Sequence, residues 1–310
     1  MLIMSTMITL SSNNLMSMWM GMEINSMMFL PILSNKMNND SMLIYFLIQS
    51  ISSVIFLTTM LLNKMMLPST LLINMMTLSL MMKLGTVPFH KWIIMIMSKM
   101  SWLNCNILMT WQKLIPLSIL HNITNNYFMM LLIIIMSITL GALGGILQTT
   151  FRKIMAYSSI NHLGWMLSTI STQLWNNYFI LYSITTTLSC YLFHKLNLLS
   201  INQMNINKNE NITNMVIFIN MMSMGGLPPL LGFLPKLIVF NWMYLSMNLM
   251  LITIMMFMSL LTLLYYMYMS LLLMLTKTIN LKWNKYFYKN TWSMMLLMMN
   301  ISLPLMLLYN

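Results

Sequence analysis

Residues 222–238 read MSMGGLPPLLGFLPKLI, and this stretch decides how the chain folds. Three glycines, three prolines and Lys236 lie together in a run that is otherwise apolar enough to cross a membrane. In a helix interior a glycine costs about 1 kcal/mol and a proline about 3 kcal/mol, and a lysine deep in a bilayer costs about 2.5–3.5 kcal/mol. The stretch therefore predicts a transmembrane helix that is interrupted beside a buried lysine.

The composition around this stretch is that of an integral membrane protein. Of the 310 residues, 59% are hydrophobic and only 6% are charged, and the mean hydropathy is +0.78. Because soluble domains are about 25% charged, this chain cannot build a water-facing surface. The net charge of +12 comes from 15 basic residues scattered in ones and twos, which favours positively charged membrane loops and argues against a nucleic-acid partner.

Residue usage also bears on cofactors and origin. The two cysteines, Cys105 and Cys190, lie in apolar surroundings and are too few for a metal cage or an iron–sulfur cluster. A glycine-rich nucleotide loop is absent from the sequence, so we expect no cofactor or metal in this chain. Met occurs 46 times, whereas Ala occurs only at Ala142 and Ala156. This bias is typical of A/T-rich coding under a mitochondrial code and predicts a mitochondrially encoded protein.

Apolar runs predict an all-α, polytopic protein with about 11 transmembrane helices in a single integral membrane domain, 1–310. The fourth span is interrupted in the first five spans, at KLGTVPFHKW (83–92), and again in the next five, at 222–238. Because five is odd, two such repeats, 1–122 and 127–275, would be inverted relative to each other, as in many transporters. A C-terminal transmembrane helix is predicted at 291–309. The ten earlier spans are predicted at 1–11, 14–33, 42–62, 69–98, 104–121, 127–149, 153–171, 177–199, 212–243 and 245–275.

Loop charges predict the orientation of these spans. With the N-terminus on the inner side, the inner loops carry nine basic residues and the outer loops carry only Lys64. If one span in mid-chain were missed or added, every later loop would be assigned to the wrong side. The excess of basic residues in the inner loops therefore supports this span order. The inner-loop residues are Lys36, Lys99, Arg152, Lys153, Lys208, Lys277, Lys282, Lys285 and Lys289.

Four charged residues are predicted at mid-membrane depth: Glu23, Lys83, Lys113 and Lys236. An ionised Glu23 needs a cationic partner there, and a structural Glu23–Lys83 pair is one reading. One carboxylate cannot neutralise three lysines, however, so the set favours a proton relay. His90 and His162 are candidates to support that relay, and structural roles for both stay open. The predicted helix-break residues are Gly85, Pro88, Gly225, Gly226, Pro228, Pro229 and Pro235.

Several motifs resemble a known family. MKLGTVPFHKW (82–92), TWQKLIPLSIL (110–120), the run 140–166 and WMGMEINSMMFLPIL (19–33) occur in the order found in the chain 2 family of NADH–ubiquinone oxidoreductase. Members of this family are antiporter-like membrane subunits of respiratory complex I. The resemblance covers nearly the whole chain. One departure is Lys91, which stands where that family has an apolar residue. Neither Lys91 nor Lys195 is assigned a role.

The resemblance implies a core membrane subunit that contributes to proton translocation in the mitochondrial inner membrane, with the N-terminus on the matrix side. It assigns proton translocation to Glu23, Lys83, Lys113 and Lys236, which form a hydrated axis in the family. It also implies that NADH, FMN, iron–sulfur clusters and ubiquinone are bound by other subunits. The implied partners are other membrane-arm subunits, among them further antiporter-like ones, and lipids such as cardiolipin. A stand-alone cation/proton antiporter and a structural membrane scaffold remain alternatives.

Overall fold

The computed structural model describes residues 1–34, 39–63, 69–123, 127–201, 211–275 and 300, and the described chain is mostly helical. The predicted helix 291–309, apart from Asn300, lies outside these residues. The helices are α1 (Leu2–Ser11), α2 (Leu15–Ser34), α3 (Asn39–Leu62), α4 (Ser69–Leu84), α5 (Lys91–Lys99), α6 (Trp102–Met109), α7 (Trp111–Ile123), α8 (Tyr127–Ile146), α9 (Phe151–Ser168), α10 (Leu174–Lys195), α12 (Asn211–Gly225), α13 (Phe233–Leu245) and α14 (Leu249–Leu275).

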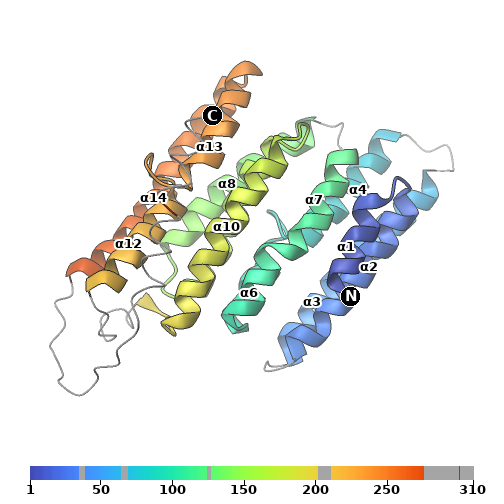
Figure 1. Ribbon diagram of the computed structural model, residues 1–310. Coiled ribbons are helices and arrows are strands. Elements are labelled where there is room, and N and C mark those ends of the chain that lie inside the picture. Colours follow the sequence, from blue (N-terminus) through green and yellow to red (C-terminus); the bar gives the residue numbers. More distant parts are fainter. Residues whose placement is uncertain (35–38, 64–68, 124–126, 202–210, 276–299, 301–310) are drawn as a thin grey trace.

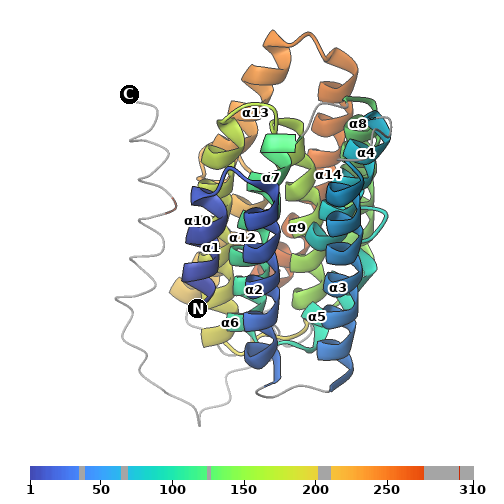
Figure 2. The ribbon, with the colours of Figure 1, turned by 90° about the vertical axis from the view of Figure 1, so that its right-hand side faces the viewer.

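The helices run roughly along one common direction, which is clear when the two views are compared (Figures 1 and 2). Helices α1–α4 lie at one edge of the molecule, α12–α14 lie at the opposite edge, and α6–α10 lie between them (Figure 1). The two halves meet where α5 and α6 pack against α9 and α10. Helix α9 is therefore central, and nearly every residue from Phe151 to Ser168 is buried.

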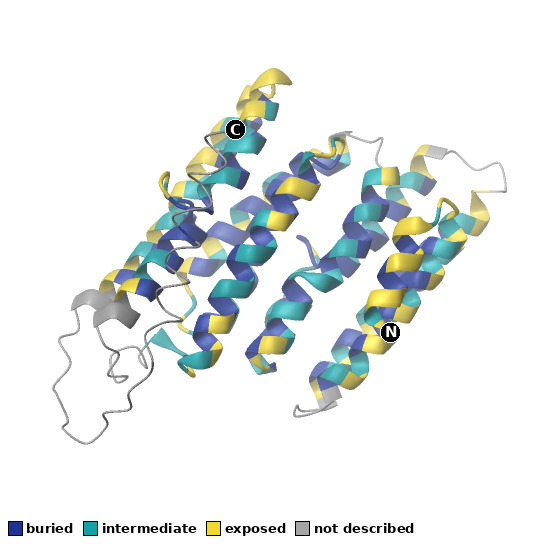
Figure 3. Cartoon of the chain, in the orientation of Figure 1, coloured by how far each residue is buried: buried dark blue, intermediate teal, exposed yellow. Residues whose placement is uncertain are grey.

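The outer surface is apolar and the interior carries polar side chains. Large hydrophobic residues such as Met7, Leu47 and Leu260 are exposed at the periphery (Figure 3), whereas lysine, asparagine and serine side chains are buried inside. This distribution suits a lipid environment, where polar groups must find partners within the protein. Three described helices are long and apolar enough to cross a membrane by themselves, at Asp40–Leu62, Phe128–Ile146 and Leu249–Leu271.

Two helices are interrupted beside a buried lysine. Helix α4 ends at Leu84 and α5 begins at Lys91, and Gly85 lies between them with a φ of 66°. Helix α12 ends at Gly225 and α13 begins at Phe233, and Gly226 lies between them with a φ of 81°. Only glycine adopts such a positive φ at little cost, so these residues allow the chain to leave the helix at mid-depth.

A further interruption was not predicted. The expected span 104–121 is divided into α6 and α7 at Thr110, whose hydroxyl donates to the carbonyl of Asn106 at 2.7 Å. Such back-bonding bends helices, and Pro116 in α7 lacks the N–H that would bond to the carbonyl of Gln112. As a result Lys113 lies in the first turn of α7 and not in the middle of a continuous helix.

The two ends of the bundle differ in charge. At one end Lys99 lies 3.7 Å from the carboxylate of Asp40, and Arg152 donates to the carbonyl of Ser98 at 3.3 Å. Lys153 follows Arg152 at the same end. At the other end Asn13, Asn63 and Asn122 line a common groove, and no Lys or Arg among the described residues lies there.

Candidate functional site

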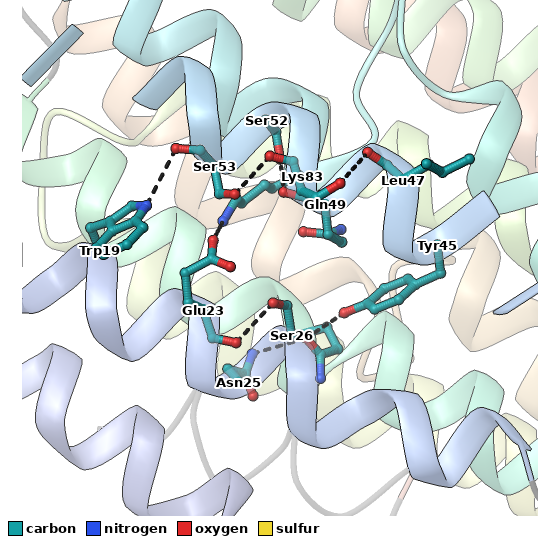
Figure 4. A network of polar contacts seen from close by, with 12 residues as sticks. Trp19, Glu23, Asn25, Ser26, Tyr45, Leu47, Gln49, Ser52, Ser53 and Lys83 are labelled. Carbon is teal, nitrogen blue, oxygen red and sulfur yellow. Dashed lines mark hydrogen bonds and ion pairs between the residues drawn. The ribbon is translucent and has the colours of Figure 1, made fainter. Parts of the chain in front are cut away.

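Glu23 and Lys83 form a partly buried ion pair between α2 and α4. The Lys83 Nζ donates to Oε1 of Glu23 at 3.4 Å, and the exposed fractions of the two side chains are 4% for Lys83 and 22% for Glu23. Figure 4 shows the two groups pointing toward each other. Lys83 is the last residue but one of α4, where the partial negative charge of the helix C-terminus also favours a cation. The interruption at Gly85 therefore creates part of the binding site for this lysine.

Lys113 connects the first half of the chain to the second. It projects from α7 and is 2% exposed. Its Nζ donates to the carbonyl of Ser159 in α9 at 3.2 Å and to the hydroxyl of Tyr182 in α10 at 3.4 Å, and it lies 5.3 Å from the centre of the Tyr182 ring. Among the described residues no carboxylate forms an ion pair with Lys113. Its charge is therefore stabilised by dipoles and by an aromatic face, and not by a carboxylate.

His162 lies between Lys113 and Lys236. Its Nδ1 is 2.8 Å from the hydroxyl of Tyr178, and its ring is 5.0 Å from that of Tyr182. The charges of Lys113 and Lys236 both act on the imidazole. Histidine can accept or donate a proton at either ring nitrogen, and His162 and Lys113 both lie against Tyr182.

Lys236 occupies the second interruption. It comes from the first turn of α13, and its Nζ donates to the carbonyl of Gly225, the last residue of α12, at 2.7 Å. This carbonyl belongs to the negative end of α12 and has no intrahelical donor. The ammonium also lies 5.9 Å from the ring centre of Trp165. A Cβ on Gly226 would come within 2.8 Å of the Lys236 Nζ, so glycine also makes room for the lysine there.

The predicted site residues do not all enter one network. Glu23 contacts Lys83, while Lys113, His162 and Lys236 come from α7, α9 and α13. His90 is half-buried in the interruption between α4 and α5, and its Nδ1 has no hydrogen-bond partner among the described residues.

The predicted helix-break residues fall in and beside the two interruptions. Gly85 and Pro88 lie between α4 and α5, and Gly226, Pro228 and Pro229 lie between α12 and α13. Gly225 is the last residue of α12. Pro235 lies inside the first turn of α13, where a missing N–H costs no intrahelical hydrogen bond.

Sequence reasoning missed the neutral partners of the lysines. Tyr178 and Tyr182 are four residues apart, so they share one face of α10 and meet His162 and Lys113. Asn25 and Gln112 lie two residues after Glu23 and one before Lys113, and they bond to each other at 2.9 Å. In the sequence, these partners could have been found as polar side chains inside spans that are otherwise apolar.

The chemistry that this arrangement suits is proton transfer. In the described part of the chain, no cluster of three or more His, Cys, Asp or Glu residues that could hold a metal was found. Cys105 and Cys190 are buried free thiols. What the interior offers is a series of titratable groups, held by backbone carbonyls and hydroxyls, which can gain and lose protons.

Comparisons with known proteins agree with this geometry. Residues 12–262 match the family model described as NADH:quinone oxidoreductase/Mrp antiporter, TM. The chain is 40% identical to NADH-ubiquinone oxidoreductase chain 2 of Anopheles gambiae over 268 residues, which are 82% of this chain and 78% of that protein. It is 39% identical to the protein of the same name from Locusta migratoria, over 77% of this chain and 73% of that one.

Solved structures share the fold at lower identity. A chain in respiratory complex I from Thermus thermophilus superposes with a TM-score of 0.78 at 20% identity, over 87% of this chain and 68% of that one. A chain of an archaeal membrane-bound sulfane sulfur reductase superposes with a TM-score of 0.79 at 16% identity, over 97% and 70%. The fold is thus shared among membrane complexes with different chemistry. The sequence identities of about 40%, in contrast, are with proteins named NADH-ubiquinone oxidoreductase chain 2, and they identify the family. The chain belongs to the NADH-ubiquinone oxidoreductase chain 2 family.

Proposed function

We propose that this chain is a proton-translocating membrane subunit of a mitochondrial NADH:ubiquinone oxidoreductase, and that Glu23, Lys83, Lys113 and Lys236 carry or gate the protons. The observation that carries the proposal is the series of buried titratable groups that runs from the Glu23–Lys83 pair through Lys113 to Lys236. Each lysine in the series is held by a different kind of partner: a carboxylate, a carbonyl with a tyrosine hydroxyl, and the end of a helix. Such different partners allow each ammonium to release its proton under a different condition.

Helix packing supports the inverted-repeat architecture. Helix α1 packs on α2 as α8 packs on α9, and α3 packs on α4 and α5 as α10 packs on α12 and α13. Helix α4 packs on α7 as α12 packs on α14. Helix α1 runs away from the basic end of the bundle, whereas α8 runs toward it. We therefore propose one membrane domain with two inverted five-helix repeats, 1–122 and 127–275, followed by a transmembrane helix at 291–309.

The fold and the family support a role inside a larger assembly. The family resemblance implies an oxidoreductase that contains flavin and iron–sulfur centres, and among the described residues of this chain no group of three or more His, Cys, Asp or Glu that could hold a metal was found. We propose that other subunits bind the redox groups and that this chain, in the mitochondrial inner membrane, receives conformational or electrostatic input from neighbouring membrane subunits. A stand-alone antiporter with this fold would exchange Na⁺ or K⁺ for protons when the chain is reconstituted alone, and a scaffold would tolerate neutralisation of all four charges.

The test replaces Lys113 by Met in the assembled complex. Methionine fills a similar volume without a titratable group, so we expect assembly to be retained and proton translocation per NADH oxidised to fall strongly. Lys99→Met is the matched control, because that lysine forms only a partly exposed ion pair at the bundle end. Full proton translocation by the Lys113 variant would refute the proposal.

A further inference from the structure

A small cavity, lined by apolar and polar side chains, lies beside the first two lysines of the series. Its volume is about 20 Å³, which is enough for one water molecule. Both Lys83 and Lys113 line it, together with the polar side chains of Asn25, Tyr45 and Gln112. In the structure the Lys83 ammonium faces Glu23, and the Lys113 ammonium faces Ser159 and Tyr182. Both lysines that line the cavity therefore have other partners in the structure.

Hydrogen bonds fix the amide of Gln112 at this cavity. Its Oε1 accepts from Nδ2 of Asn25 at 2.9 Å and from the hydroxyl of Tyr45 at 3.4 Å. Figure 4 shows Asn25 and Tyr45 pointing toward this region from α2 and α3. Tyr45 is itself held between the rings of Phe29 and Trp92. Gln112 thus has little freedom to turn away.

Two residues that line this cavity each carry a buried polar atom without a partner among the described residues: Nε2 of Gln112, which is a donor, and Oδ1 of Asn25, which is an acceptor. Rotating both amides by 180° would exchange the atoms but would still leave one donor and one acceptor. In addition, Pro116 cannot donate to the carbonyl of Gln112, so a backbone acceptor lacks its usual helical partner beside the same cavity. Unpaired buried groups of this kind are costly unless water satisfies them.

We propose that Gln112, held by Asn25 and Tyr45, is a positioning residue that binds a water molecule in this cavity and thereby supports proton transfer between Lys83 and Lys113. The water accepts from the Gln112 amide and donates to Asn25, which leaves one proton and one lone pair for the two lysines when their ammonium groups turn from their present partners toward the cavity. In the transfer step the water takes a proton from the ammonium of Lys83 and gives one of its own protons to the neutral amine of Lys113, so water is regenerated and one charge moves. The reverse step uses the same contacts. This inference rests on the proposed function.

The first test compares Gln112→Met with Gln112→Glu in the assembled oxidoreductase. Methionine preserves length but offers no strong donor or acceptor, so the rate of proton translocation should fall by roughly tenfold, the effect of losing one hydrogen bond to a charged group. Glutamate can still accept from Asn25 and Tyr45 and can donate when protonated, so it should restore most of the rate. Asn106→Leu is the control, because it removes another half-buried amide with an unpaired oxygen outside the cavity.

Wild-type translocation in Gln112→Met, equal losses in the Met and Glu variants, or an equal loss in Asn106→Leu would each overturn the inference. A second measurement does not depend on any variant: an experimental density map of the wild-type complex should contain a water within hydrogen-bond distance of Gln112 and Asn25. Its absence, in a map with ordered waters elsewhere in the membrane region, would also overturn it. Lys113→Met separates the proposed function from the role of Gln112. If proton translocation is lost in Lys113→Met but normal in Gln112→Met, only the role of Gln112 is refuted.

Discussion

Lys83 and Lys236 show how a single residue can be charged inside an apolar protein. Each lies beside the carbonyl end of a half-helix, but Lys83 also has the carboxylate of Glu23, whereas Lys236 has the carbonyl of Gly225 and the ring of Trp165. A carboxylate compensates a buried ammonium far better than a neutral dipole does. Among the described residues, Lys236 therefore depends on neutral partners alone.

Glu23→Gln should destabilise the protein through Lys83. The substitution leaves a buried ammonium without its carboxylate, and breaking a fully buried pair costs about 3–5 kcal/mol, an upper limit here because Glu23 is 22% exposed. We expect less assembled complex and a lower temperature of thermal inactivation. The double variant Glu23→Gln/Lys83→Met should recover assembly while proton translocation stays low.

Asp40→Asn is the control for this prediction. Asp40 pairs with Lys99 at 3.7 Å, but its side chain is 74% exposed, and exposed pairs contribute about 0–1 kcal/mol. Equal losses of assembly in the Glu23 and Asp40 variants would contradict the view that burial makes the Glu23–Lys83 pair important.

Gly226→Ala should disturb Lys236 without removing it. Alanine at a φ of 81° is strained by about 1–2 kcal/mol, and its methyl group would displace the Lys236 ammonium. We expect slower proton translocation in an assembled complex. In Gly225→Ala the added Cβ meets nothing closer than 3.5 Å, so this neighbouring substitution should leave translocation unchanged; the same result for both variants would count against a steric link to Lys236.

The helices differ in how well the sequence predicts them. Apolar runs predicted 14–33 and 245–275, and the structure has α2 at Leu15–Ser34 and α14 at Leu249–Leu275, because lipid-facing surfaces demand continuous apolar residues. The interruption at Thr110 was missed because Thr110 and Pro116 are each tolerated in transmembrane helices when neighbouring groups satisfy the backbone.

The partners of the buried charges were harder to predict than their depth. Hydropathy places Glu23 and the lysines near mid-membrane, but it does not say which helices lie side by side. Lys113 contacts Ser159 and Tyr182, which lie 46 and 69 residues away from it along the chain. These contacts follow from the packing of α6, the helix directly before α7, against α9 and α10, which a hydropathy pattern from one sequence does not specify.

Helices α8 and α9 are packed closely through glycine, and this contact positions His162. A Cβ on Gly141 would lie 2.8 Å from the backbone nitrogen of Asn161, so Gly141→Ala must push the two helices apart. Small residues permit this kind of approach in membranes, and overpacking costs about 1–3 kcal/mol. We expect lower thermal stability and slower proton translocation. In Gly145→Ala the nearest group is a side chain, the Tyr265 ring at 3.0 Å, and not the backbone of the neighbouring helix, so equal destabilisation by both substitutions would contradict this account.

At the scale of the whole molecule, the unequal charge of the two ends predicts the orientation in the membrane. Lys99, Arg152 and Lys153 gather at one end, and positive residues remain on the side from which insertion occurs. We therefore expect this end to face the matrix. Because α1 begins part-way through the bundle and runs away from that end, the N-terminus should lie toward the matrix side as well.

Cysteine labelling tests this orientation. Ser101 is exposed beside the basic end, and Ser171 is exposed at the opposite end after α9, while the native Cys105 and Cys190 are buried and should not react. In mitochondria stripped of the outer membrane, a membrane-impermeant maleimide should label Ser171→Cys but not Ser101→Cys, and permeabilisation should expose both. The reverse pattern would place the positive end outside. Such a result would mean that neighbouring subunits, and not the charges of this chain, determine its orientation in the membrane. The orientation in turn decides which side of the membrane Lys83 and Lys236 face.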